Sequence, residues 1–285
     1  MMWWYFFLFV VARGDFAVIG DWGRAGTEDQ KEIATVLNEM DLDFVISTGD
    51  NFYPSGLTSV TDPQAHDWVR IYNSKVPWYL CLGNHDYRGD TEAQIRLTDV
   101  FSKWNMPSRY FQKKIGDIEF WFLDTTAWLD SNHNYKDEPD YWLLEKERLS
   151  ILDQYQWLEH GLMNSTALRK IIVGHHPLWT FGEHVHEDND KMLQDIPELM
   201  ERYNVESYLC GHDHNLQYVT SAGVQEFISG GGAWYYEWTW QLGFREIDDA
   251  ELHFGTSELG VLVVSEDLEY TFYSKDGKVM YFTKL

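Results

Sequence analysis

Short apolar segments that lead into Gly, Asp, Asn or His recur along the whole chain. Runs of about four to six residues without polar alternation suit strands that are buried on both faces. These segments are Phe16–Ile19, Phe44–Ser47, Trp78–Leu82, Glu119–Leu123, Lys170–Val173, Glu206–Cys210 and Gln225–Ser229. The pattern therefore predicts a sheet-based fold in which chemically active side chains follow the ends of the strands.

Helical patterns lie between these strands. Thr27 and Gln30 form a capping-box pattern before apolar residues at helical spacing. Asp153 with Gln156 predicts the start of a second helix. Residues 190–203 predict a third, which Pro197 should kink or shorten because proline lacks a backbone donor.

The remaining segments favour antiparallel strands. Arg109–Leu123 predicts a hairpin that turns near Gly116-Asp117, and Gly260–Tyr273 and Val279–Lys284 predict strands that turn at Asp276-Gly277. We therefore expect an α/β fold with mixed sheets. Candidate ligands run from Asp21 to His214, so both halves must fold together, and we expect one domain over residues 13–285.

The chain is strongly acidic, with a formal net charge of −24. It has no basic surface for nucleic acid and would repel anionic membranes, so we expect no nucleic-acid partner and no stable membrane insertion. It would also repel phosphate esters at long range. Phosphate chemistry would then need strong local positive charge, which metal cations can supply. We expect a monomer.

The first 12 residues are almost uniformly apolar but too short to span a bilayer, which needs about 20 residues. Val10 and Ala12 fit a signal-peptidase site, so we interpret residues 1–12 as a signal peptide and expect a secreted, lysosomal or vacuolar protein. An interfacial anchor or a misassigned start are the alternatives. Asn164-Ser165-Thr166 is a glycosylation sequon, although such triplets are common by chance.

The chain has two cysteines, Cys81 and Cys210, too few for a disulfide framework. Each lies in an apolar segment just before a glycine of a polar loop. We expect buried free thiols rather than a bridge between the two.

The polar loops supply carboxylate, amide, phenol and imidazole groups. They are Asp21, Asp50 with Asn51 and Tyr53, Asn84 with His85, His175, and His212 with His214. Oxygen donors mixed with imidazoles suit Fe, Zn or Mn rather than Ca. Because one catalytic ion keeps open positions, this many donors predicts two ions that share a carboxylate.

Each loop alone has an ordinary explanation. Gly-Asp after a strand is usually a turn, and a lone His-x-His pair is more often not a ligand pair. The occurrence of all the loops in order, always after a strand, favours the metal site.

The same loops resemble the five motifs of the calcineurin-like metallophosphoesterases. The matching segments are Gly20–Gly23, Gly49–Tyr53, Gly83–Asp86, Val173–His175 and Gly211–His214. Tyr53 resembles the tyrosine ligand of the small, tartrate-resistant purple acid phosphatases, which other branches of the superfamily generally lack. The resemblance covers residues 15–285. It implies a sandwich of mixed sheets flanked by helices.

The resemblance also implies a ligand set. A ferric ion would be bound by Asp21, Asp50, Tyr53 and His214, and a divalent ion (Fe(II), Zn or Mn) by Asp50, Asn84, His175 and His212. Anionic ligands suit the trivalent ion, and neutral amide and imidazole groups suit the divalent one.

His85 and His184 resemble the outer histidines that hold the phosphate and protonate the leaving group. A histidine can be cationic at mildly acidic pH, which suits both tasks. His186 is a second candidate in the same segment as His184, whose alternative reading is a solvated loop. His176 could pack behind its neighbouring ligand or contact substrate.

We therefore expect an acid phosphatase that hydrolyses phosphate monoesters, including phosphoproteins, with a metal-activated hydroxide. The alternatives are a phosphodiesterase or nucleotide hydrolase of the same superfamily, and a non-catalytic metal-binding or storage protein. Residues 234–240, WYYEWTW, could line a substrate groove or serve only for packing.

Overall fold

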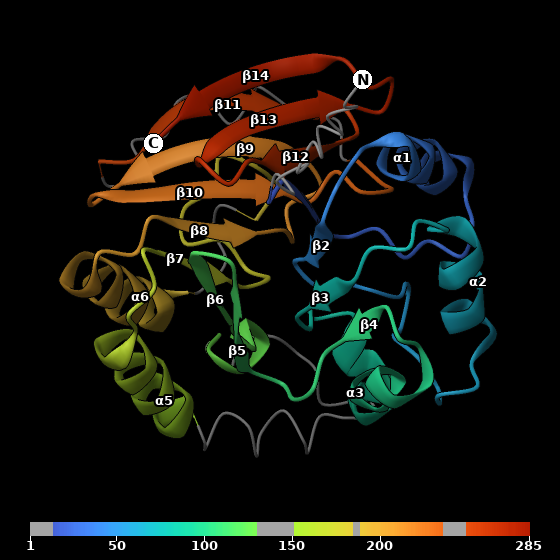
Figure 1. The fold of residues 1–285 in the computed structure, drawn as a ribbon, viewed down its shortest axis with the longest axis horizontal. Helices are drawn as coiled ribbons and strands as arrows, with labels where there is room; N and C mark the ends of the chain where they lie inside the picture. Colours follow the sequence, from blue (N-terminus) through green and yellow to red (C-terminus); the bar gives the residue numbers. More distant parts are fainter. Residues whose placement is uncertain (1–13, 130–150, 185–188, 236–248) are drawn as a thin grey trace, which may run out of the picture.

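Two seven-stranded mixed sheets form the framework of this protein (Figure 1). The computed structural model describes residues 14–129, 151–184, 189–235 and 249–285. The predicted signal peptide and His186 therefore lie outside the described residues. Among the residues that the structure describes, no helix has the length and apolar character needed to cross a membrane.

The first sheet has the strand order β14-β13-β12-β1-β2-β3-β4. Its parallel part consists of β1 (Phe16–Ile19), β2 (Phe44–Ser47), β3 (Trp78–Leu80) and β4 (Trp104–Asn105). Its antiparallel part consists of β12 (Gly260–Val264), β13 (Glu269–Ser274) and β14 (Val279–Lys284). Strands from the two ends of the chain thus meet where β1 pairs with β12.

The second sheet has the order β11-β9-β10-β8-β7-β6-β5. β6 (Ile118–Phe122), β7 (Arg169–Val173), β8 (Ser207–Cys210) and β10 (Val224–Ser229) run parallel. β5 (Phe111–Ile115), β9 (Leu216–Ser221) and β11 (Glu251–Thr256) are antiparallel to their neighbours. The mixed sheets predicted from the sequence are confirmed.

Helices cover the outer faces of the sheets (Figure 1). α1 (Glu28–Glu39), α2 (Pro63–Ile71) and α3 (Thr91–Val100) lie beside the first sheet, and α5 (Ile151–Asn164) and α6 (Asp190–Tyr203) beside the second. Two short 3-10 helices, η1 (Asp86–Arg88) and η2 (Thr125–Ala127), follow β3 and β6. α1 and α6 each bury an apolar face, which includes Ile33 in α1 and Ile196 in α6.

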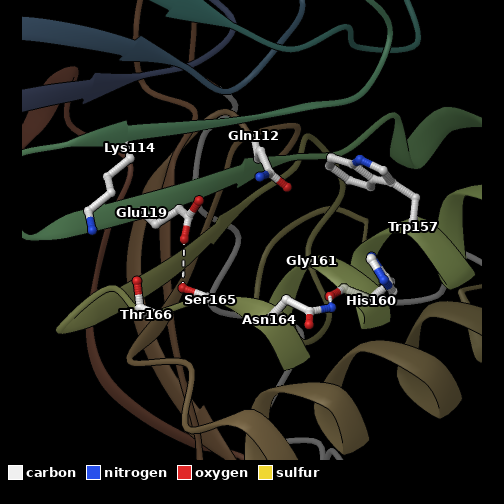
Figure 2. A pocket seen from close by; sticks show the side chains of 9 residues that line it. All are labelled: Gln112, Lys114, Glu119, Trp157, His160, Gly161, Asn164, Ser165 and Thr166. Carbon is white, nitrogen blue, oxygen red and sulfur yellow. Dashed lines mark hydrogen bonds between the residues drawn. The ribbon is translucent and has the colours of Figure 1, made fainter.

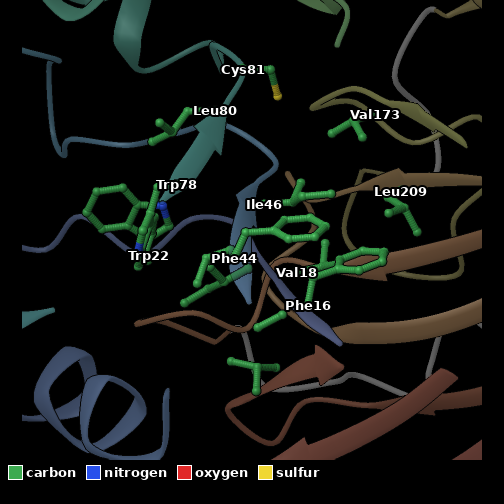
Figure 3. Packing of buried hydrophobic residues seen from close by; sticks show 14 of the residues in the cluster. Phe16, Val18, Trp22, Phe44, Ile46, Trp78, Leu80, Cys81, Val173 and Leu209 are labelled. Carbon is green, nitrogen blue, oxygen red and sulfur yellow. The ribbon is translucent and has the colours of Figure 1, made fainter. Parts of the chain in front are cut away.

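The largest apolar cluster contains residues of both sheets (Figure 3). Phe16 of β1 stacks on Phe44 of β2, with ring centroids 4.8 Å apart. Phe120 of the other sheet meets the Phe16 ring edge-on at 5.3 Å. These contacts pack the sheets together, and this packing sets the relative position of the loops at their strand ends.

The hairpin of β5 and β6 and the turn between β13 and β14 are confirmed. The predicted start of the second helix at Asp153 is wrong, since the helix already includes Ile151. α6 runs the full predicted length to Tyr203, with Pro197 inside it, so the shortening did not occur. Buried Met192, Ile196 and Leu199 hold that helix against the sheet, and this packing outweighs the missing backbone donor.

Candidate metal centre

The predicted ligands come from loops that follow strands of both sheets. Asp21 follows β1, Asp50 and Tyr53 follow β2, and Asn84 follows β3. His175 follows β7, and His212 and His214 follow β8. All are buried. We call these seven residues the ligand cluster: Asp21, Asp50, Tyr53, Asn84, His175, His212 and His214.

Three members of the ligand cluster have a backbone conformation that non-glycine residues rarely adopt. Asp21, Asp50 and His212 have φ angles of 61°, 51° and 68°. Such left-handed residues cost free energy and concentrate at functional sites. Each of the three residues directly follows a glycine and lies within three residues of the end of a strand, where the chain turns away from the sheet.

Tyr53 lies at the centre of one half of the cluster. Its hydroxyl oxygen is 2.8 Å from Oδ1 of Asp21 and 2.5 Å from Oδ2 of Asp50. It is also 3.0 Å from Nε2 of His214. Three donor atoms, two of them from carboxylates, therefore lie 2.5–3.0 Å from the Tyr53 oxygen.

His175 lies at the centre of the other half. Its Nδ1 is 2.8 Å from the carbonyl oxygen of Thr48, which can only accept, so Nδ1 carries a proton. Its Nε2 is then directed at Oδ1 of Asn84 (3.1 Å) and Nδ1 of His212 (3.2 Å). A backbone partner on the remote ring nitrogen is the usual way in which a metal-binding histidine is oriented.

Asp50 joins the two halves. Its Oδ2 faces the Tyr53 hydroxyl, whereas its Oδ1 is 3.5 Å from Nε2 of His175. One carboxylate thus presents one oxygen to each half. This is the arrangement that a bridging ligand requires.

The electrostatics of the cluster favour bound positive charge. Burial alone would raise the pKa of Asp21, but the hydrogen bond to His214 and the charges of the nearby histidines hold it below its ordinary value. Burial and the carboxylates of Asp21 and Asp50 raise the pKa of Tyr53 well above its ordinary value. Those same carboxylates overcome burial and raise the pKa of His175. The shifts of Tyr53 and His175 reflect the negative charge of two carboxylates concentrated in a buried volume.

The donor set fits the predicted metal ions. Nε2 of His175 and the side-chain oxygens of Asn84 and Asp50 are acceptors grouped within 3.1–3.5 Å of the nitrogen. Only a proton or a cation can hold such acceptors together. Among the described residues, Asp21, Asp50 and His175 form one group with metal-binding spacing, and His175, His176 and His212 form another.

His85 lies beside the Tyr53 half. Its ring centroid is 4.4 Å from that of Tyr53, and its backbone N–H donates to Oδ1 of Asp50 at 2.8 Å. Its Nε2 is 4.0 Å from Oδ2 of Asp50. Burial lowers the pKa of His85 below its ordinary value, and Asp50 only partly opposes that shift.

His184 lies on the other side, against the His175 half. Its ring centroid is 4.0 Å from that of His212. Its Nδ1 and its backbone nitrogen are 2.8 Å and 3.1 Å from Oδ1 of Asp213, a carboxylate that also accepts from the Thr180 hydroxyl. The structure therefore brings His184 to the cluster, although its segment could equally have been a solvated loop.

His176 is buried behind the ligand cluster. Its Nδ1 is 2.9 Å from the Thr125 hydroxyl, and its ring centroid is 4.4 Å from that of His212. With 1% exposure, it packs behind its neighbours, as one of the two readings of the sequence expected.

Asn51, which the sequence pattern placed among the candidate donors, is not part of the ligand cluster. Its amide donates to the carbonyl of Cys81 and to Asp86, and its Oδ1 accepts from Ser47. It thus ties the loop after β2 to the loop after β3. No role was predicted for Asp86 and Asp213. The signal that could have identified them is their position in the chain: Asp86 is two residues after Asn84, and Asp213 lies between His212 and His214.

Cys81 and Cys210 are buried and free, as predicted. Burial is the largest of the causes that raise the pKa of both thiols well above the ordinary value. They therefore pack as small apolar side chains beneath the loops.

The fold and the ligand cluster together define a metal-dependent phosphoesterase. The sequence profile of the calcineurin-like phosphoesterases matches residues 14–216 of this chain. A solved structure described as GAP50, the anchor in the inner membrane complex of Plasmodium, superposes with a TM-score of 0.74 at 22% identity. That superposition covers 96% of this chain and 89% of the other, and it is a likeness of fold.

The curated relatives narrow the family further. Purple acid phosphatase 4 of Arabidopsis thaliana is 36% identical, covering 93% of this chain and 81% of the relative. Human tartrate-resistant acid phosphatase type 5 is 29% identical, covering 95% and 90%. The chain belongs to the purple acid phosphatases, and it is a metal-dependent phosphoric monoester hydrolase. These relatives do not favour the diesterase or the storage protein.

Proposed function

We propose that Asp21, Asp50, Tyr53 and His214 bind Fe(III), and that Asp50, Asn84, His175 and His212 bind a divalent ion. The observation that carries this assignment is the Tyr53 hydroxyl, which lies 2.5–3.0 Å from two carboxylates and an imidazole. A trivalent ion offsets the charge of two carboxylates and a phenolate, whereas the other half offers one shared carboxylate and neutral donors.

The bound ions would supply a hydroxide for attack on phosphorus and neutralise the phosphate oxygens. Asp50 links the two halves, with one carboxylate oxygen directed at each. His85 and His184 flank the cluster on its two sides, where each can donate a hydrogen bond to a phosphate oxygen or to the leaving oxygen. Asp213 lies 2.8 Å from Nδ1 of His184 and so orients the His184 ring.

The visible spectrum of the purified protein tests the ferric assignment. We expect a purple phenolate-to-iron band that is absent in Tyr53→Phe. Tyr72→Phe, which alters another buried tyrosine, should retain the band. Colourless protein that contains only zinc and is fully active would disprove the iron assignment.

Substrate class is tested by a comparison of 4-nitrophenyl phosphate with bis(4-nitrophenyl) phosphate at mildly acidic pH. We expect the monoester to be hydrolysed with the higher kcat/KM. A preference for the diester would contradict a phosphomonoesterase, and metal-replete protein inactive on both would revive the non-catalytic alternative.

We also propose that residues 13–285 work as one domain and that residues 1–12 direct the protein to secretion or to a lysosomal or vacuolar compartment. Asn164, the sequon residue, is exposed and its amide donates to the carbonyl of His160 at 2.7 Å. It borders a pocket of about 440 Å³ between the β5–β6 hairpin and α5 (Figure 2). A mass shift on glycosidase treatment after secretory expression, absent in Asn164→Gln, would support both compartment and glycosylation.

A further inference from the structure

A cationic side chain lies at the rim of the ligand cluster, between two aromatic rings. The guanidinium carbon of Arg24 is 3.6 Å from the ring centroid of Tyr53 and 5.2 Å from that of Trp234. Both distances are within the range of cation–π contacts. Arg24 thus connects a ligand of the cluster to a tryptophan outside it.

The chain holds Arg24 in this place through its backbone. A Cβ atom at Gly23 would lie 1.8 Å from the carbonyl oxygen of Asn51, so only glycine lets the two loops approach this closely. The Tyr53 N–H donates to the carbonyl of Gly23 at 2.8 Å. The residue after Gly23 is therefore held against the loop that carries Tyr53.

Trp234 reaches the rim from the other sheet. It follows β10 and a run of glycines, and a Cβ atom at Gly232 would lie 2.3 Å from the carbonyl oxygen of Gly20. The chain therefore passes directly over the start of the Asp21 loop before it reaches Trp234. Two loops from different sheets thus bring Arg24 and Trp234 together.

Trp234 is 47% exposed, whereas Trp22, Trp78 and Trp121 are buried in the apolar clusters. The Trp234 ring is therefore not part of the apolar core. It offers an apolar, polarizable surface next to Arg24 at the rim of the ligand cluster. If the phosphate binds at that cluster, the group attached to the phosphate can contact this ring. Arg24 adds a delocalised positive charge in a chain whose net charge is −24.

We propose that Trp234 forms a subsite for the leaving group, which favours aromatic phosphate monoesters, and that Arg24 is a positioning residue that holds the Trp234 ring at the rim of the ligand cluster. The substrate class is that of phenyl and phenylalkyl phosphates, including the phosphotyrosine side chain. This inference rests on the proposed function, because it assumes that the phosphate binds at the ligand cluster.

The test compares 2-phenylethyl phosphate with propyl phosphate, two esters of primary alcohols whose leaving groups are chemically alike. We expect the wild-type protein to favour the phenylethyl ester. Trp234→Ala should lower the ratio of the two kcat/KM values about three- to tenfold, the size of one aromatic contact. Trp234→Phe should retain most of the ratio, and Phe282→Ala, which removes an aromatic ring exposed on β14, should not change it.

Arg24→Met should lower the same ratio in the wild-type background. In the Trp234→Ala background it should lower the ratio little further, because Arg24 acts through the Trp234 ring. Equal effects of Arg24→Met in both backgrounds would show that Arg24 does not position Trp234. An unchanged ratio in Trp234→Ala, or no aromatic preference in the wild type, would overturn the subsite.

Calorimetry with phenylphosphonate and ethylphosphonate separates this inference from the proposed function. We expect tighter binding of phenylphosphonate to the metal-replete protein, and loss of that difference in Trp234→Ala. If neither ester is hydrolysed but the binding difference persists, the subsite stands and the proposed function fails. If both esters are hydrolysed and the binding difference is absent, the proposed function stands and the subsite fails.

Discussion

The Tyr53 hydroxyl lies 2.5 Å from one oxygen of Asp50, while the other oxygen of that carboxylate faces the His175 side of the site. A single side chain from the loop after β2 therefore links donors that come from both sheets. The predictions that follow depend on this link, on the groups around it and on the packing that holds the sheets together.

Asp50→Asn should remove the shared negative charge and weaken binding of both ions. Mutation of a residue that hydrogen-bonds to a metal ligand typically lowers metal affinity or activity about 10- to 100-fold. We therefore expect a larger loss of kcat/KM when the bridging ligand itself is changed. Metal content by mass spectrometry should fall below two ions per chain. Asp67→Asn, in an ion pair with Arg70 at the surface, is the control. Two tightly bound ions in Asp50→Asn would contradict the bridge.

His184→Gln should slow hydrolysis of alkyl phosphates more than that of 4-nitrophenyl phosphate. An alkoxide needs a proton as it leaves, and general acid catalysis is worth about 10²- to 10⁴-fold, whereas nitrophenolate leaves readily. Asp213→Asn should give a smaller loss in the same direction, since it removes the negative charge of the partner at 2.8 Å but keeps a hydrogen-bond acceptor. Equal losses on both substrates would exclude His184 as the acid, and the same comparison on His85→Gln would then test His85.

Glu226 should make stability depend on pH. Its side chain is buried and accepts from the N–H groups of Leu178 and Trp179, and burial raises its pKa from 4.5 to about 8. The native state therefore keeps a proton that the unfolded chain loses above pH 4.5. The stabilising contribution is complete below that pH and decreases by about 1.4 kcal/mol per pH unit until the native group also ionises.

Urea unfolding of Glu226→Gln and wild type at several pH values measures this effect. Glutamine keeps an acceptor for the two backbone N–H groups but does not ionise. The free energy of unfolding of the variant relative to wild type should rise between about pH 5 and pH 8. A difference independent of pH would show that Glu226 is ionised in the folded protein at acidic pH.

Phe120→Ala should destabilise the protein by about 3–5 kcal/mol, the cost of a large cavity in a packed core. The ring is fully buried and contacts Phe16 and Phe44 of the opposite sheet. Val279→Ala, at a position 60% exposed on β14, should change the free energy of unfolding by less than about 0.5 kcal/mol. A loss in Phe120→Ala no larger than in this control would show that the two sheets do not depend on this contact.

Local patterns in the sequence predicted the strands well. The segments Phe16–Ile19 and Phe44–Ser47 are β1 and β2 to the residue, because an apolar run that ends in glycine and a polar residue is a short-range signal. Helix ends were predicted less well. Pro197 is tolerated within α6 through burial against the sheet, and that burial is absent from any local window of sequence.

The sequence by itself determined which residues could bind metal, because carboxylate, phenol, amide and imidazole groups follow the strands in order. Only the tertiary structure decided how they meet. The placement of Asp50 between Tyr53 and His175, and of Arg24 between Tyr53 and Trp234, joins loops of two sheets. The contact of Asp213 with His184 joins the loops after β8 and β7. These relationships depend on packing between residues far apart in the chain, and the local pattern of residues carries no information about that packing.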